Sequence, residues 1–176
     1  MATLDPIVFA RYAACSLVLA ATSSVADAAD ERWRLRMDRL GPISVGMTAA
    51  QVGKAVGPHV ADVSPNNECF HLRGRGNLSG VSFMMIGGEV ARIEVDTMSV
   101  VSWSGARIGS TEEQIKKIYG ARLKVEPHKY LENDGHYLTL RSRDGRFGIR
   151  FETEKSRVFR FYAGPWEHLR YVEGCA

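Results

Sequence analysis

The 176-residue sequence has only three cysteines, little excess of either charge and no apolar run long enough to cross a membrane. Three cysteines are too few for a disulfide-dense mini-protein or for a zinc site built from paired Cys-x-x-Cys motifs. The 23 Lys and Arg residues against 20 Asp and Glu residues leave a net charge of +3, which is too balanced to demand a nucleic-acid partner. A transmembrane helix needs about 20 apolar residues, and no segment approaches that length.

The composition is that of a folded globular protein. Hydrophobic residues make up 45% of the chain and charged residues 24%, which excludes disordered, collagen-like and coiled-coil chains. The length corresponds to one ordinary domain or to two very small ones.

The first 28 residues have the pattern of a secretory signal peptide. Arg11 precedes the apolar run 12–21, and Ala26-Asp27-Ala28 fits the small-x-small rule for cleavage. We therefore expect cleavage near Ala28 and a periplasmic or secreted mature protein without a membrane span. The alternatives are an uncleaved N-terminal anchor and a lipoprotein attached through Cys15.

Cleavage after residue 28 removes Cys15 and leaves Cys69 and Cys175. An even number of cysteines in an exported protein favours a disulfide, so we predict one between these two residues. Closing a loop of about 100 residues adds up to ~4–5 kcal/mol on the loop-entropy model. The alternative is two free thiols.

Two segments of the mature chain resemble each other. Residues 44–57 and 107–120 are offset by 63 positions and match at five of 14 positions. Such internal similarity indicates a tandem repeat, whereas two unrelated helices with similar caps are the alternative. The matching pairs are Gly46/Gly109, Thr48/Thr111, Gln51/Gln114, Lys54/Lys117 and Gly57/Gly120.

The matching residues predict where a short helix begins and ends in each segment. A threonine followed three residues later by glutamine is a capping box, and a glycine after the last turn favours a left-handed C-cap. Each helix is about two turns long and has to pack on other elements to be stable. The predicted caps are Thr48, Gln51 and Gly57 in the first segment and Thr111, Gln114 and Gly120 in the second.

The residues after each predicted helix alternate between apolar and polar side chains, as in half-buried strands. The first half has strands at 81–85 and 91–95 around a Gly87-Gly88 turn, and the second has strands at 137–141, 147–151 and 158–162. We predict an α+β fold of two tandem repeats, each a short helical segment on a small antiparallel sheet. The first repeat spans residues 29–104 and the second 105–176, and the two sheets can join edge to edge.

The segment 40–57, with Gly46-Met47-Thr48 and Val52, resembles the opening of a repeat found in two groups of exported bacterial proteins. One group is the small outer-membrane-assembly lipoproteins of the BamE (SmpA/OmlA) type, and the other is the beta-lactamase-inhibitor proteins, which carry two such repeats. The resemblance in the arrangement of helices and strands extends over most of residues 38–176. Because members of both groups bind proteins, it implies a binding module and not an enzyme.

Enzyme and cofactor motifs are missing from the sequence. It contains no His-Glu-x-x-His, Cys-x-x-Cys or Gly-x-Ser-x-Gly pattern, and its glycine pairs are not followed by a phosphate-binding helix. We therefore predict no catalytic residue, no metal ligand and no cofactor. The competing hypothesis is an envelope hydrolase that uses His128, His136 and a carboxylate. Because Glu126 and Asp134 lie nearby in the sequence, a metal site at the two histidines is a further alternative.

Aromatic and arginine side chains provide the candidate contact residues, because Trp, Tyr and Arg are enriched at the centres of protein interfaces. The candidates for partner binding are Trp103, Tyr130, Tyr137, Arg141 and Arg150. The 17 arginines outnumber the six lysines and concentrate in the last third of the chain, which leaves an anionic-polymer binder as another alternative.

The sequence thus predicts an exported, non-catalytic protein-binding module, either an inhibitor of a hydrolase or a factor in envelope assembly. Its expected partner is a protein in the cell envelope or outside the cell, and no nucleic acid is expected. The oligomeric state stays open.

Overall fold

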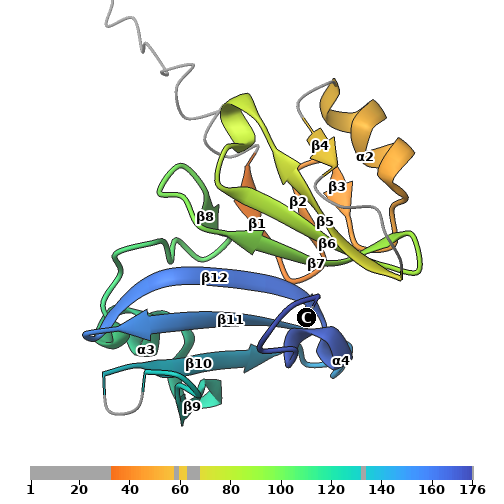
Figure 1. Cartoon of the computed structure of the whole chain (residues 1–176). Helices are drawn as coiled ribbons and strands as arrows, with labels where there is room; N and C mark the ends of the chain where they lie inside the picture. The colour runs from red at the N-terminus through yellow and green to blue at the C-terminus, as the bar shows by residue number, and fades with distance from the viewer. Residues whose placement is uncertain (1–32, 58–59, 63–67, 132–133, 176) are drawn as a thin grey trace, which may run out of the picture.

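The computed structural model of the chain describes residues 33–57, 60–62, 68–131 and 134–175 (Figure 1). The predicted signal peptide and its cleavage near Ala28 lie outside these residues. Within the described part of the chain, no helix has the length and apolar character needed to cross a membrane.

The structure confirms the α+β class, with few helices and two sheets. The helices are α2 (Ala49–Val56), α3 (Glu112–Tyr119) and α4 (Trp166–Leu169), with short 3-10 turns at Gly76–Leu78 and Gly120–Arg122. The larger sheet has eight strands. In chain order they are β4 (Val60–Asp62), β5 (Cys69–Gly74), β6 (Val81–Ile86), β7 (Glu89–Val95), β9 (Lys124–Pro127), β10 (His136–Arg141), β11 (Phe147–Glu154) and β12 (Arg157–Pro165).

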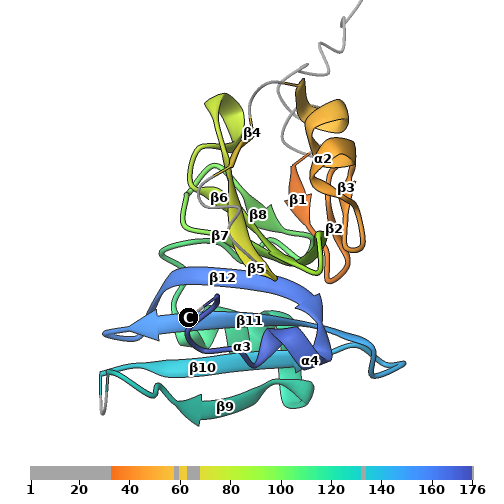
Figure 2. The same ribbon diagram turned by 45° about the vertical axis from the view of Figure 1, so that its right-hand side comes forward.

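The strand order of this sheet is β4-β5-β6-β7-β12-β11-β10-β9, and every neighbouring pair is antiparallel. At its centre β7 pairs with β12 through the partners Val95↔Phe161, Glu94↔Tyr162 and Ile93↔Ala163. Strands from both halves of the chain therefore form one continuous sheet, as expected if the two predicted sheets join edge to edge. In Figure 2, β12 lies between the strands of the first half and the rest of the second half.

A second, smaller sheet has the strand order β3-β2-β1-β8. Its strands are β1 (Arg34–Leu35), β2 (Arg39–Leu40), β3 (Ile43–Ser44) and β8 (Val101–Ser102), and β1 pairs with β8 in parallel. The sequence does not predict this sheet, because strands of two residues are too short to show an alternating pattern.

The predicted capping boxes are present at the start of α2 and α3. The Thr48 hydroxyl accepts a hydrogen bond from the Gln51 backbone N–H at 3.3 Å, and the Gln51 side chain accepts one from the Thr48 N–H at 2.8 Å. Thr111 and Gln114 make the same two bonds at 3.2 and 2.8 Å. Each pair satisfies two N–H groups that a helix leaves without intrahelical partners.

Gly57 and Gly120 are the C-caps of these helices, but their geometry differs from the prediction. Their φ angles are 71° and 64°, and their ψ angles are −159° and −154°. The predicted left-handed helical conformation is therefore wrong in ψ. Glycine is still favoured at both positions, because other residues rarely adopt a positive φ.

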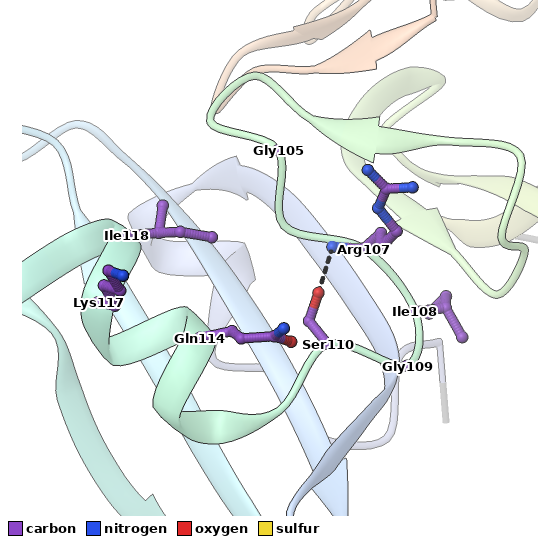
Figure 3. A pocket seen from close by; sticks show the side chains of 8 residues that line it. All are labelled: Gly105, Arg107, Ile108, Gly109, Ser110, Gln114, Lys117 and Ile118. Carbon is purple, nitrogen blue, oxygen red and sulfur yellow. Dashed lines mark hydrogen bonds between the residues drawn. The ribbon is translucent and has the colours of Figure 1, made fainter.

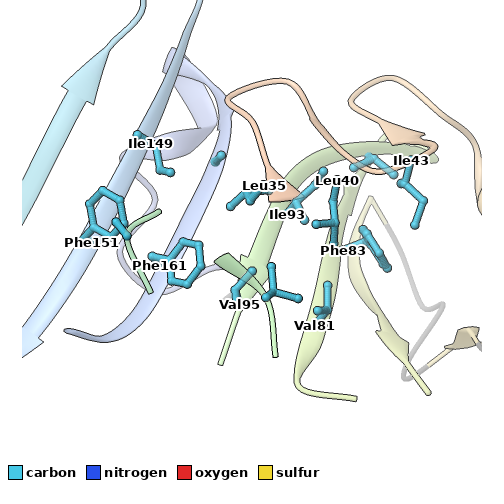
Figure 4. Close-up of a cluster of buried hydrophobic side chains, with 14 of the residues drawn as sticks. Leu35, Leu40, Ile43, Val81, Phe83, Ile93, Val95, Ile149, Phe151 and Phe161 are labelled. Carbon is cyan, nitrogen blue, oxygen red and sulfur yellow. The ribbon is translucent and has the colours of Figure 1, made fainter. Parts of the chain in front are cut away.

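The hydrophobic core lies on one face of the eight-stranded sheet (Figure 4). Phe151 and Phe161 stack there with their ring centroids 5.5 Å apart. The small sheet covers this face together with α2 and α3, each of which contributes one fully buried side chain, Val52 and Ile115. Because side chains alternate along a strand, the residues between the core positions point to the opposite face.

Candidate functional site

The face of the eight-stranded sheet opposite the core carries a layer of polar side chains, which we call the polar face. Each of these residues is at most 6% exposed. Buried polar groups of this kind are costly unless they are hydrogen-bonded, so their partners define the site. The polar face consists of Ser82, Arg92, Glu94, Tyr137, Thr139, Arg150, Glu152 and Tyr162.

An ion pair between Arg92 and Glu94 lies at the centre of the polar face. Arg92 Nε and Nη2 donate to Glu94 Oε1 at 2.9 and 2.6 Å, and Ser82 Oγ donates to Glu94 Oε2 at 3.3 Å. The Arg92 guanidinium also lies 4.5 Å from the centre of the Tyr162 ring. Both partners of the pair are nearly inaccessible to water, with 5% and 9% of their side chains exposed.

The environment of Glu94 keeps its carboxyl group ionised. Burial alone would raise its pKa, but the hydrogen bond with His71 and the charge of Arg92 outweigh burial and lower the pKa to about 2. His71 Nε2 lies 3.5 Å from Glu94 Oε1. The carboxylate is therefore negatively charged at neutral pH, and its position is fixed by Arg92, Ser82 and His71.

A second hydrogen-bonded group occupies the part of the polar face on β10 to β12. Glu152 accepts a hydrogen bond from the Tyr162 hydroxyl at 2.8 Å, and His128 Nε2 lies 3.5 Å from the same carboxylate. Burial, followed by the charge of Glu152, raises the pKa of Tyr162. Arg150 donates to Thr139 at 2.9 Å, so these side chains are held in place by one another.

The C-terminal segment, residues 170–175, lies over the polar face. The predicted disulfide between Cys69 and Cys175 is present and ties the end of the chain to β5. Arg92 Nη1 donates to the Tyr171 carbonyl at 2.5 Å, and Glu173 accepts hydrogen bonds from Lys129 at 3.0 Å and from the Tyr130 hydroxyl. Figures 1 and 2 show the end of the chain beside β11 and β12.

A polar pocket of about 210 Å³ remains between the polar face and the C-terminal segment. Its wall includes the ion pair of Arg160 with Asp96, whose nitrogen and oxygen atoms are 2.6 Å apart and which is partly exposed. The pocket contains cationic and anionic groups in similar number, so it favours neither sign of ligand charge. Its other charged or titratable lining residues are His71, Arg73, Arg92, Glu94, Glu152, Tyr162 and Glu173.

Three exposed aromatic residues lie next to residues of this site, and we call them the aromatic rim. They are Tyr130, Phe159 and Tyr171, which are 54%, 38% and 47% exposed. The rings of Tyr130 and Phe159 both lie near the His128 ring, with centroid distances of 6.3 and 6.1 Å. A β-bulge between Glu152 and Thr153 leaves Phe159 as an extra residue of β12 and turns it away from the core.

The structure places the five predicted contact residues in two different environments. Trp103, Tyr130 and Arg141 are exposed, and guanidinium groups stack on two of the indole rings: Arg36 on Trp103 and Arg141 on Trp166.

Tyr137 and Arg150 need a correction, because each is only 5% exposed. Their side chains contact each other in the polar face, with the guanidinium 4.8 Å from the ring centre, and they offer almost no surface to a partner.

The structure does not bring His128 and His136 together. His128 stacks on Tyr137 in the polar face, with 4.4 Å between the ring centroids. His136 precedes Tyr137 in β10 and points to the opposite face, where its Nδ1 lies 2.8 Å from Glu112 Oε1. The described residues contain no group of three His, Cys, Asp or Glu side chains suited to a metal ion.

Another cavity, of about 540 Å³, lies between α3 and the segment that precedes it. Figure 3 shows that its functional groups do not converge, because the Arg107 guanidinium lies on the far side of this segment from Lys117. Ser110 accepts a hydrogen bond from the Arg107 backbone N–H at 3.1 Å and so serves the local fold. This cavity has no arrangement that points to a chemical step.

Sequence reasoning missed the central residues of the polar face, Arg92, Glu94 and Tyr162. A usable signal exists, since an arginine followed two residues later by a glutamate occurs in both β7 and β11, as Arg92/Glu94 and Arg150/Glu152. In a strand, that spacing places opposite charges on the same face.

Comparisons with known proteins do not identify a family for this chain. No protein-family model matches the chain, and no curated protein matches it. Among solved structures, the chain is similar to the uncharacterized protein yfeY from Escherichia coli, with 12% sequence identity and a TM-score of 0.43. That similarity covers 74% of this chain and 99% of the other, and it is too distant to transfer a fold or a function.

Proposed function

We propose that the protein is an exported, non-catalytic binding module that recognises a protein partner through the aromatic rim and the polar pocket beside it. The observation that carries this proposal is the presence of three exposed aromatic residues beside one rigid polar face: Tyr130 and Phe159 near His128, and Tyr171 in the segment bonded to Arg92. Tyrosine is among the residues that contribute most to binding at interface centres, and the adjoining charges provide orientation.

The rigidity of the site supports the same proposal. The buried charges and hydroxyls are fixed by hydrogen bonds, and the disulfide fixes the segment that carries Tyr171. Side chains ordered before binding lose little conformational entropy when a partner arrives. Inhibition of an envelope hydrolase and envelope assembly are the two roles that we propose for such a surface.

We also propose that the chain consists of two tandem copies of one unit, like the repeats of the exported proteins that it resembles. In both halves a helix with a capping box is followed by four strands of the larger sheet. The segment before α2 makes two backbone hydrogen bonds to Val90 in β7, of 2.9 and 2.8 Å, and the segment before α3 makes the same two to Val158 in β12, of 2.8 and 2.9 Å. The unit boundary at residues 104 and 105 stays a prediction.

The proposal is tested by capture from an envelope extract. The mature chain, residues 29–176 with the disulfide intact, is compared with a rim variant carrying Tyr130→Ala and Phe159→Ala. The matched control is Trp103→Ala, which removes an aromatic side chain of similar exposure (50%) outside the rim.

We expect one protein to be captured by the wild type and by the control, and to be reduced at least about tenfold by the rim variant, which corresponds to ~1.4 kcal/mol. Equal capture by all three chains, or no captured protein, contradicts the proposal. Capture of a polyanion that is lost at high salt instead supports the anionic-polymer alternative.

A further inference from the structure

A groove lies on the core side of the larger sheet, opposite the polar face. We call it the junction groove, because β1 and the residues after β8 form one side of it and α3, β10 and β11 form the other. Its volume is about 310 Å³, near the lower limit of about 300 Å³ for pockets that hold small ligands. Pockets of this kind occur preferentially where two parts of a protein meet.

The inner surface of the junction groove is apolar. Leu35, Leu140 and Ile149 belong to the hydrophobic core and reach the groove from β1, β10 and β11. The Trp103 indole forms a wall and is 50% exposed, which is unusual for a side chain with so large an apolar surface. An apolar group that enters the groove removes part of this indole from water, and that burial is favourable.

The edge of the junction groove carries a positive charge. The Arg36 guanidinium lies 3.5 Å from the centre of the Trp103 ring. Among the ion pairs of the described residues, Arg36 is paired with no carboxylate, and the acidic residue nearby, Asp38, is paired with Arg39 at 3.2 Å. The guanidinium therefore keeps its donors available for an anion that sits beside the indole.

We propose that the junction groove binds a small amphipathic carboxylate, a short hydrocarbon chain or single ring that ends in a carboxylate group. The hydrocarbon part contacts Trp103, Leu140 and Ile149, and the carboxylate accepts hydrogen bonds from Arg36. A cation is disfavoured, because the Arg36 guanidinium is positive and Asp38, the carboxylate in the described lining, is paired with Arg39. This site is separate from the aromatic rim, so it can exist whether or not the proposed protein binding does.

The test is a titration of the ¹⁵N-labelled mature chain with decanoate below its micelle concentration, followed by NMR. The chain has three tryptophans, and among them only Trp103 lines the groove, so the indole N–H signals of Trp33 and Trp166 serve as internal references. We expect a saturable shift of the Trp103 signal alone. Decyltrimethylammonium, which has the same chain length and the opposite charge, should bind at least about tenfold more weakly.

Two variants separate the groove from general surface charge. Arg36→Gln should weaken decanoate binding by about threefold to tenfold, because a charge-assisted hydrogen bond is lost at a partly exposed site. Arg39→Gln removes the neighbouring exposed arginine and should leave the affinity unchanged.

Four results overturn the proposal: no saturable shift at millimolar decanoate, equal binding of the cationic probe, equal shifts of all three indole signals, or equal loss of binding in both variants. The rim variant with Tyr130→Ala and Phe159→Ala should bind decanoate normally, so failure of either proposal is recognised independently.

Discussion

Replacing Arg92 with methionine should destabilise the protein far more than its position on a sheet face suggests. Methionine keeps the apolar length of the side chain but removes the guanidinium, which makes two hydrogen bonds to Glu94 and one each to the carbonyls of His168 and Tyr171. The variant leaves the Glu94 carboxylate buried, with only Ser82 and His71 as partners. The stability cost comes mainly from this uncompensated charge and not from the lost attraction.

Breaking a buried ion pair by removing one partner costs about 3–5 kcal/mol. For a folded unit of this size, each kcal/mol corresponds to about 2–4 °C in melting temperature. We therefore expect Arg92→Met to lower the melting temperature by about 6–20 °C. The double variant Arg92→Met with Glu94→Leu removes both charges, and we expect it to regain at least half of the lost stability.

The assay is urea unfolding at pH 7, followed by far-UV circular dichroism on the wild type, both single variants and the double variant. The four unfolding free energies form a double-mutant cycle, which isolates the coupling between the two side chains. A loss below about 1 kcal/mol for Arg92→Met would show that water or other groups solvate Glu94. A double variant as unstable as the sum of the single variants would refute the reasoning from a shared buried charge.

Three further predictions concern the acid response, the disulfide and a helix cap. The pKa of Glu94 is about 2 in the folded protein, against 4.5 for an unperturbed glutamate. The ionised carboxylate therefore contributes fully to folding stability above about pH 4.5, and this contribution is lost as the pH falls toward 2. That contribution is about 3 kcal/mol. The urea concentration at the unfolding midpoint should therefore decrease as the pH is lowered from 5 to 3, and Glu94→Gln should make this decrease smaller. Cys175→Ser opens a link between residues 106 positions apart and should cost up to ~4–5 kcal/mol while the circular dichroism spectrum keeps its shape; equal melting of the oxidised and reduced wild type contradicts this. Thr111→Ala removes the hydroxyl of a capping box and should cost about 0.5–2 kcal/mol in urea unfolding, whereas Thr111→Ser should retain most of the stability.

Local sequence patterns predict much of this fold. Two-residue turns such as Gly87-Gly88 need positive φ angles, which glycine adopts readily, and the structure has φ of 59° and 83° there. The capping boxes follow from the hydroxyl and amide groups of residues three positions apart. The disulfide follows from the number of cysteines that remain after the predicted cleavage. In each case the physical cause lies within a few residues or in a simple count.

The remaining features depend on contacts between distant parts of the chain. Alternation along β10 and β11 shows that Tyr137 and Arg150 share a face, but not that this face is closed to solvent. Closure comes from residues near the C-terminus that reach across to Arg92 in β7. The parallel pairing of β1 with β8 has the same long-range character, and no local pattern records it.

The strand order of the larger sheet has a consequence for aggregation. Because the last strands of the two halves meet at the centre, the edges of the larger sheet among the described residues are β4 and β9, the strands that enter this sheet first in each half. Free edges can recruit strands from other chains. On β9 the charged side chains of Lys124 and Glu126 form an ion pair of 2.8 Å, and Pro127 has no N–H group to offer to an added strand. This edge therefore resists fibril-like pairing between copies of the protein.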